Sequence, residues 1–360
     1  MADEDLPISP TRPRPPSGRG DLILTVEDLH VSFPAEQGVV KAVDGVSFEV
    51  CENEVLGVVG ESGSGKTVTA LAMLGLLPRT AKLSGSVRFR DQELLNLEEK
   101  ELRLVRGAEI AMVFQDALAA LNPVYKVGSQ IGEAIKVHHP EIHRHELRER
   151  VVGLLDLVGI PNPADRADQY PHEYSGGMRQ RAMIAMAICN DPDVLIADEP
   201  TTALDVTIQA QVLEVMERIQ DRTSSAIILI THDLGVVAGL ADRVLVMYAG
   251  RPAELGDVET IFYRSEHPYT LGLLASLPRL DQDEPDVRLH RIKGQPPSLV
   301  FVPPGCPFHP RCDFARLPEP CATQIPELRS LDDPSHVAAC HFSEEVREKK
   351  PEDLRPVVGS

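Results

Sequence analysis

The pattern of apolar and polar residues along the 360-residue chain predicts an α/β fold. Short apolar runs bounded by Gly- and Asp-containing turns are typical of strands, and they fall at residues 22–26, 46–50, 55–59, 194–197 and 226–230. Apolar residues at helical spacing lie between and after them, at residues 67–77, 131–137, 146–158, 177–188 and 208–219. Strands that alternate with helices indicate a sheet covered by helices.

The same pattern divides the chain into regions. Residues 1–20 carry five prolines and almost no large apolar side chain, which predicts a disordered leader. We expect one large domain over residues 21–280, with an all-helical insert at about residues 116–179, where no strand pattern occurs. Beyond this domain Pro, Arg and Cys become frequent, so we expect a small separate module at residues 281–345 and a charged tail at 346–360.

Composition narrows the classes of ligand and location. The net charge is −19, Trp is absent and no long run of Lys and Arg occurs, so nucleic acid is not expected as a ligand. No apolar stretch approaches the roughly 18 residues that cross a bilayer, and the N-terminus has no signal-peptide core. We therefore expect a cytosolic chain that reaches a membrane only through partner proteins.

Residues 60–67, GESGSGKT, fit the phosphate-binding pattern G-x-x-x-x-G-K-[ST]. An apolar strand precedes this loop and a helix follows it, which favours a phosphate site over a glycine-rich turn with a solvated lysine. In such a loop the backbone amides surround the phosphates of ATP, the lysine reaches the β- and γ-phosphates, and the hydroxyl ligates Mg²⁺. The residues concerned are Ser62, Gly63, Ser64, Gly65, Lys66, Thr67 and Val68, with Lys66 and Thr67 in the last two roles.

A second apolar strand ends in two carboxylates, Asp198 and Glu199. Side chains alternate along a strand, so the two carboxylates point differently although both lie at its end. We expect Asp198 to hold Mg²⁺ and Glu199 to act as the base that polarises the attacking water. An apolar strand capped by Asp-Glu is common, and the phosphate-binding loop is what favours this interpretation.

A third motif, EYSGGMRQR at residues 173–181, precedes a long helix, so Ser175, Gly176 and Gly177 would present backbone amides to an anion. It resembles the signature motif of ABC ATPases. Further motifs of that family follow the family's order along the chain, namely Gln115 in VFQ, Asp205 in ALD and His232 in THD. The resemblance implies an ABC-type nucleotide-binding domain, that is, a P-loop α/β core with an antiparallel β part and a helical insert.

The resemblance also implies roles for residues that would otherwise be interpreted as surface polar groups. Gln115 would contact Mg²⁺ and the attacking water, His232 the γ-phosphate, and Asp205 would couple two ATP sites. Residues 175–177 would bind the nucleotide of a partner chain. Phe33 is the candidate for stacking on adenine, and a core residue at a strand end is an equal interpretation.

Four segments, at residues 119–124, 175–181, 267–270 and 305–312, resemble the oligopeptide/dipeptide importer branch of the family. This resemblance implies two membrane-spanning permease subunits, a second, non-identical ATPase subunit and an extracytoplasmic substrate-binding protein. The chain would then lie at the cytoplasmic face of the membrane. Import of nickel or another small solute is an alternative within the same branch. A soluble, non-transport ABC ATPase is a further alternative, disfavoured by the single phosphate loop and the lack of a heptad run.

Four of the six cysteines fall within 35 residues: Cys306, Cys312, Cys321 and Cys340. Reduced cytosolic thiols favour metal ligation over disulfides, but these spacings do not select the metal. The importer branch includes members with a cluster bound by cysteines in this region, so the resemblance implies one [4Fe–4S] cluster.

Zinc is the alternative, with His309, His336 and His341 as nearby ligands, and an unmetallated module is the third possibility. We expect a structural role, because a Pro-rich segment with few large apolar residues needs a staple to fold. Cys51 and Cys189 are expected to be buried as small apolar residues.

Overall fold

The computed structural model describes residues 20–36, 38–116, 120–202, 205–277 and 291–354. Its centre is a seven-stranded sheet in the order β11-β10-β9-β3-β8-β7-β6. The bounds of these strands are β3 Val55–Val59, β6 Ile110–Val113, β7 Val194–Asp198, β8 Ala226–Thr231, β9 Arg243–Tyr248, β10 Arg251–Asp257 and β11 Val337–Ala338. The five strands from β9 to β6 are parallel, β10 runs antiparallel to β9, and β11 runs antiparallel to β10.

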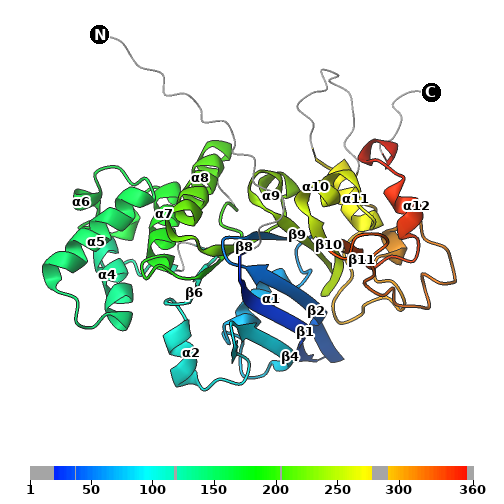
Figure 1. Ribbon diagram of the computed structural model, residues 1–360, viewed down its shortest axis with the longest axis horizontal. Coiled ribbons are helices and arrows are strands. Elements are labelled where there is room, and N and C mark those ends of the chain that lie inside the picture. The colour runs from blue at the N-terminus through cyan, green and yellow to red at the C-terminus, as the bar shows by residue number, and fades with distance from the viewer. Residues whose placement is uncertain (1–19, 37, 117–119, 203–204, 278–290, 355–360) are drawn as a thin grey trace, which may run out of the picture.

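The parallel strands are buried on both faces, which explains why they form continuous apolar runs in the sequence. Alternate residues face two different hydrophobic cores. Val55, Val59 and Leu229 pack with α8 (Val206–Thr223) and α9 (Leu234–Leu240), whereas Leu56 and Val58 pack with α1 (Lys66–Met73) and the second sheet. Figure 1 shows α8 and α9 on one side of the large sheet, with α1 and the second sheet on the other.

The second sheet is antiparallel, in the order β2-β1-β4-β5, with β1 Leu22–Ala35, β2 Gly38–Cys51, β4 Lys82–Phe89 and β5 Gln92–Glu93. Strand β1 continues well beyond the predicted residues 22–26. Its pairing with β2 shifts between Val26 and Leu29, where Asp28 has a φ of 46°. This bulge breaks the two-residue alternation from which the strand was predicted. The sequence pattern missed β4, in which only Val87 and Phe89 are buried.

The region predicted as a helical insert contains several helices. In the described part of residues 116–179 the regular elements are all helical: α4 (Val127–His138), α5 (Arg144–Leu157), α6 (Pro163–Arg166), the 3-10 turn Pro171–Glu173 and the start of α7 (Gly176–Ala187). Ile131, Ile135 and Leu155 are fully buried between these helices. The insert lies at one end of the molecule and the C-terminal region lies at the other (Figure 1).

The C-terminal region is joined to the large sheet. Strand β11 pairs with β10 through Glu254↔Ala338 and Leu255↔Val337, so the expected small module extends the sheet of the main domain. The remaining helices of this half are α10 (Val258–Tyr263), α11 (Pro268–Ala275), α12 (Ser343–Arg347) and the 3-10 turns His309–Arg311 and Pro351–Leu354; α2 (Glu99–Val105) lies near β6 in the chain.

The two predicted chain ends are only partly described. The predicted leader lies outside the described residues except for Gly20. The predicted charged tail starts within α12, where Val346 is fully buried and packs with Leu271, and its residues 355–360 lie outside the described part.

Candidate nucleotide-binding site

The phosphate-binding loop, residues 60–67, joins β3 to α1, as the sequence predicts. Gly65 has a φ of +102°, and a Cβ there would lie 2.4 Å from the carbonyl oxygen of Ala42. At Gly60 a Cβ would lie 2.3 Å from the carbonyl oxygen of Met247. Both positions therefore require glycine, because any larger residue would push the loop off its neighbours.

Lys66 lies across the inside of this loop. Its Nζ donates hydrogen bonds to the carbonyl oxygens of Gly60 at 2.6 Å and Glu61 at 3.0 Å. Burial lowers the pKa of Lys66, while the charges of Glu199 and Asp198 act in the opposite direction. A buried amine held by backbone carbonyls is placed to exchange these bonds for stronger ones to phosphate oxygens.

Asp198 ends β7 directly beside the start of α1. Thr67 Oγ1 donates a hydrogen bond to Asp198 Oδ1 at 3.1 Å. Asp198 is buried, and this burial together with the charge of Glu199 raises the pKa of Asp198. A hydroxyl and one carboxylate are suitable oxygen ligands for Mg²⁺, which keeps several waters and also binds substrate phosphates.

Glu199 lies where the carboxyl ends of the parallel strands β6, β7 and β8 meet. Its Oε2 accepts hydrogen bonds from Gln115 Nε2 at 3.0 Å, after β6, and from Thr202 Oγ1 at 2.7 Å. His232 Nδ1, after β8, lies 3.5 Å from the same oxygen. Glu199 has a φ of +46°, a strained conformation for a non-glycine residue, which turns its side chain towards these partners.

Sequence reasoning did not select Thr202. Its hydroxyl makes the shorter of the two hydrogen bonds to the Glu199 carboxylate, and Thr202 lies in the turn three residues after Glu199. That i+3 spacing of a hydroxyl after a carboxylate is a signal of local pairing that could have found it.

The signature residues begin α7. Ser175 caps the helix, and its Oγ accepts a hydrogen bond from Met178 N at 3.3 Å. Ser175 and Gly176 are exposed, whereas Gly177 packs closely on α8, where a Cβ would lie 2.7 Å from Ile208. Within the described part of the chain no hydrogen bond joins residues 175–177 to the phosphate-binding loop.

Two further predicted residues stand apart from the Glu199 cluster. Asp205 caps α8, its Oδ1 accepting a hydrogen bond from Ile208 N at 3.0 Å, and Ala203 and Leu204 beside it lie outside the described residues. Phe33, the adenine candidate, lies in β1 and packs half-buried against the core of the antiparallel sheet.

The four C-terminal cysteines converge, and each thiol accepts a backbone hydrogen bond. Phe308 and His309 donate to Cys306, Phe314 to Cys312 at 3.3 Å, Arg316 to Cys321 at 3.4 Å and Phe342 to Cys340 at 3.4 Å. Burial, with smaller contributions from the neighbouring thiols, raises the pKa of Cys312 and of Cys340 to about 12. Among the described residues no group of three or more His, Cys, Asp or Glu side chains is arranged to hold a metal ion.

The three histidines near these cysteines have other partners. His309 Nδ1 lies 2.9 Å from the carbonyl oxygen of Cys306, and His341 Nε2 lies 3.0 Å from that of Gln324. His336 Nε2 lies 2.8 Å from Glu254 Oε1. Cys51 and Cys189 are buried in the main domain, as predicted.

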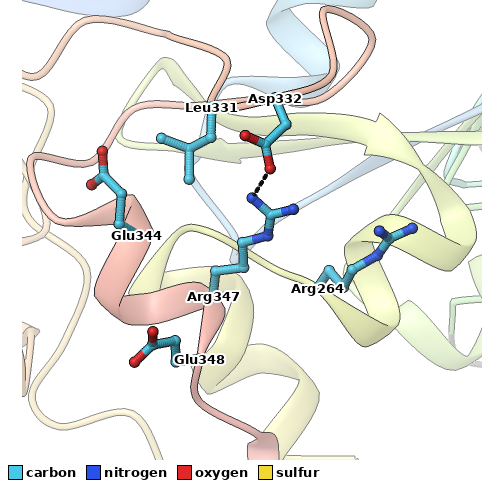
Figure 2. A pocket seen from close by; sticks show the side chains of 6 residues that line it. All are labelled: Arg264, Leu331, Asp332, Glu344, Arg347 and Glu348. Carbon is cyan, nitrogen blue, oxygen red and sulfur yellow. Dashed lines mark hydrogen bonds and ion pairs between the residues drawn. The ribbon is translucent and has the colours of Figure 1, made fainter.

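A surface groove of about 610 Å³ lies in the C-terminal half, away from the sequence motifs. It is lined by Arg264, Leu331, Asp332, Glu344, Arg347 and Glu348, and Figure 2 shows Arg347 directed at Asp332, at 2.5 Å. No motif residue lines it.

No helix in the described ranges has both the length and the apolar character that a membrane crossing needs.

Comparison with known proteins gives matches over most of the chain. The ABC transporter family matches residues 43–202, and the family described as oligopeptide/dipeptide transporter, C-terminal region, matches residues 253–321. The dipeptide transport ATP-binding protein DppD of Bacillus subtilis is 54% identical over 81% of this chain and 87% of its own length. The oligopeptide transport ATP-binding protein OppD of Salmonella typhimurium is 47% identical over 89% of this chain and 93% of its own.

Other matches cover a smaller share of one of the two proteins compared. OppD of Mycobacterium tuberculosis is 50% identical over 92% of this chain, which spans 54% of that protein. Among solved structures, a dimeric ATP-binding cassette in a post-hydrolysis state with ADP and phosphate gives a TM-score of 0.60 at 22% identity, covering 66% of this chain and 99% of that one, a likeness of fold. CbiO1 of Clostridium perfringens gives 0.57 at 28% identity, with 67% and 91% covered.

The fold is that of an ATP-binding cassette, and relatives at 47–54% identity show that the chain is an ATP-binding subunit of an ABC transporter. Identities near 50% along most of the length define the branch. The chain belongs to the ATP-binding proteins of the oligopeptide/dipeptide import family.

Proposed function

We propose that this chain binds and hydrolyses MgATP to drive import of di- or oligopeptides through two membrane-spanning permease subunits. The observation that carries the proposal is the set of polar groups around Glu199. A carboxylate that accepts bonds from Gln115 and Thr202, with His232 beside it, lies next to the Thr67–Asp198 pair and the phosphate-binding loop. This arrangement suits in-line attack of water on a bound phosphate.

The chemical step divides among these residues. Lys66 and the loop amides from Ser62 to Val68 hold the phosphates and offset the charge that develops on them. Glu199 accepts a proton from water, whose oxygen bonds to the γ-phosphorus as the bond to the β–γ bridging oxygen breaks. Gln115 and His232 orient the water and the γ-phosphate, and Thr202 holds the Glu199 carboxylate in place.

Mg²⁺ fits the oxygen donors available here. Thr67 and Asp198 would hold it, with Gln115 nearby, because each offers an oxygen at the end of a strand or the start of a helix. The ion would supply charge neutralisation on the β- and γ-phosphates.

A complete site needs a second chain. Ser175 and Gly176 are exposed at the start of α7 and make no bond to the phosphate-binding loop in the described part of their own chain. Residues 175–177 would bind the nucleotide held by a second, non-identical ATPase subunit, and Asp205 would couple the two sites. Phe33 is proposed to stack on the adenine.

The helical insert is the proposed contact with the permeases. Val124 and Tyr125 are 70% and 58% exposed, at a turn shortly after Gln115. Exposed apolar side chains in a surface turn favour an interaction surface. An extracytoplasmic substrate-binding protein would deliver the peptide, and the chain would lie at the cytoplasmic face of the membrane.

We also propose that the four C-terminal cysteines bind one [4Fe–4S] cluster in a structural role. Backbone N–H donors to each sulfur support it, since such bonds stabilise thiolates bound to iron. Zinc is the alternative, since four thiolates also suit a tetrahedral ion. The other contacts of His309, His336 and His341 weigh against zinc held by these histidines.

The test is reconstitution of the chain with its permease and second ATPase subunits in vesicles. ATP hydrolysis should rise when peptide-loaded binding protein is added, and labelled peptide should accumulate. Uptake of nickel but not of peptide would replace the substrate proposal. Failure to assemble with any membrane subunit would favour a soluble ATPase.

A further inference from the structure

Glu61, the second residue of the phosphate-binding loop, is held by a residue 250 positions away. Arg311 Nη1 lies 2.5 Å from Glu61 Oε2, and Arg311 Nη2 lies 2.9 Å from Glu61 Oε1. Arg311 is buried, and the Glu61 side chain is 28% exposed. Paired two-point contacts of this kind fix both the charge and the orientation of a carboxylate.

The backbone of Glu61 is held from the same side. The Glu61 N–H donates to Tyr269 Oη at 2.8 Å, and the Glu61 carbonyl accepts from Lys66 Nζ at 3.0 Å. Tyr269 is fully buried, and its ring packs against Tyr248 and Phe308, with centroids 4.7 and 5.4 Å away. A tyrosine fixed by two neighbouring rings gives the loop a rigid hydrogen-bond partner.

Arg311 is fixed as well. Its Nε donates to the carbonyl oxygen of Lys293 at 2.8 Å, and its Nη1 lies 3.3 Å from Tyr248 Oη. Arg311 directly precedes Cys312 in the chain, and Tyr269 lies in the segment HPYT at the start of α11. Two C-terminal sequence motifs thus converge on one residue of the loop, and the proposed ATP site gives neither of them a role.

We propose that Arg311 and Tyr269, here called the Glu61 clamp, are positioning residues that hold the phosphate-binding loop open for ATP and neutralise its one acidic side chain. Glu61 acts electrostatically on Lys66, so an unpaired Glu61 carboxylate would compete with the phosphates for that amine. The inference rests on the proposed ATP site and adds to it a contribution from the C-terminal region.

The experiment measures the Kd of MgATP for the full chain by isothermal titration. Arg311→Gln should weaken binding about tenfold, since a charge pair that is largely desolvated loses one partner. Glu61→Gln in the Arg311→Gln background should restore the Kd to within about threefold of the wild type, because the competing charge is then gone. Tyr269→Phe, which keeps the buried ring, should weaken binding by about threefold.

Arg316→Gln is the matched control. Arg316 lies in the same module and makes a two-point contact with Glu345, at 2.5 and 2.7 Å, on the exposed surface. Its loss should leave the Kd unchanged, and thermal melting of each variant reports folding.

The outcomes separate the clamp from the proposed ATP site. If the wild type and Arg311→Gln bound ATP equally, the clamp would be refuted and the site would stand. A loss that Glu61→Gln did not recover would also refute it, because Arg311 would then act only on folding. If the wild type bound no ATP, or Lys66→Ala bound it normally, the proposed site would fail and the clamp with it.

Discussion

At the scale of single residues, Glu199 is the most demanding assignment. Glu199→Gln keeps the shape and the bonds to Gln115 and Thr202 but removes the proton acceptor, so we predict a fall in kcat of about 100-fold or more with ATP binding retained. A closed dimer of the two ATPase subunits should accumulate in ATP. Single-turnover kinetics and gel filtration test this, with the partner subunit's own site disabled, and full turnover would remove Glu199 from the role of base.

Thr202 gives a second prediction. Thr202→Val removes the hydroxyl that donates to Glu199 at 2.7 Å while keeping the volume, so kcat should fall about tenfold with KM for ATP unchanged. Thr202→Ser retains a hydroxyl and should recover most of the rate. Equal kcat in Thr202→Val and the wild type would mean that the backbone and Gln115 position Glu199 without Thr202.

The sequence predicts those site residues that belong to a recognisable local pattern. Lys66, Asp198 and Glu199 each lie at the end of a recognisable strand or in a fixed loop pattern, and the structure places them together. The pairing of Glu61 with Arg311 could not be predicted in this way, because nothing local marks two charged residues that meet across 250 positions.

At the scale of elements, the insert shows which apolar residues are core and which are free for a partner. Leu121, Val127 and Ile131 are buried and belong to the local core, whereas Val124 is 70% exposed. Apolar spacing alone does not separate the two classes, because residues on a turn and residues on a buried helix face are equally hydrophobic.

Val124→Glu is therefore predicted to weaken the affinity for the permease subunits by about tenfold or more, since it places a charge in the proposed apolar contact. The ATPase activity of the chain with its partner ATPase alone should be unchanged. Val137→Glu is the control, because Val137 is 69% exposed at the far end of α4 from the Val124–Tyr125 turn that carries the docking proposal. Equal co-purification of both variants with the permeases would argue against docking here.

Strand β11 offers a prediction about pH. His336, beside β11, is buried between Glu254 at 2.8 Å and Glu266 at 3.4 Å, with Arg347 and Asp332 nearby. Burial opposes protonation, but the two carboxylates outweigh it and raise the pKa of His336, and burial also raises the pKa of Glu266. Both raised values contribute stability that is present at low pH and lost as the pH rises through the folded-state pKa.

We therefore expect the free energy of unfolding of the C-terminal region to fall as the pH rises from 6 to 9. His336→Gln should reduce that dependence, leaving the smaller part that comes from Glu266. Hydrogen exchange of β11 at the two pH values would measure it, and a pH dependence that persisted in the variant would assign it to other groups.

At the scale of the whole molecule, the sequence predicts three of the five parallel strands, β3, β7 and β8, but not β6, β9 or the way the C-terminal region attaches. Strand β11 has only two residues, too few for any periodicity, and it adds to the edge of the large sheet. The texture change near residue 280 marks a change in composition, and composition carries no information on which sheet edge a short strand will pair with.

The last prediction concerns the four cysteines, whose bound cluster we propose stabilises a Pro-rich region with little regular structure. Their thiols come from 35 residues of chain, and β11, Arg311 and Phe308 of the same region contact the main domain. Protein purified without oxygen should be brown and hold four iron and four sulfide per chain, and Ser at any one of the four positions should remove the colour. Cys189→Ala, in the main domain, is the control and should stay brown.

Because Arg311 adjoins Cys312, Cys312→Ser should also weaken ATP binding. Colourless wild-type protein with stoichiometric zinc would overturn the cluster and leave a metal staple, while a colourless, metal-free protein that still bound ATP normally would remove the staple as well.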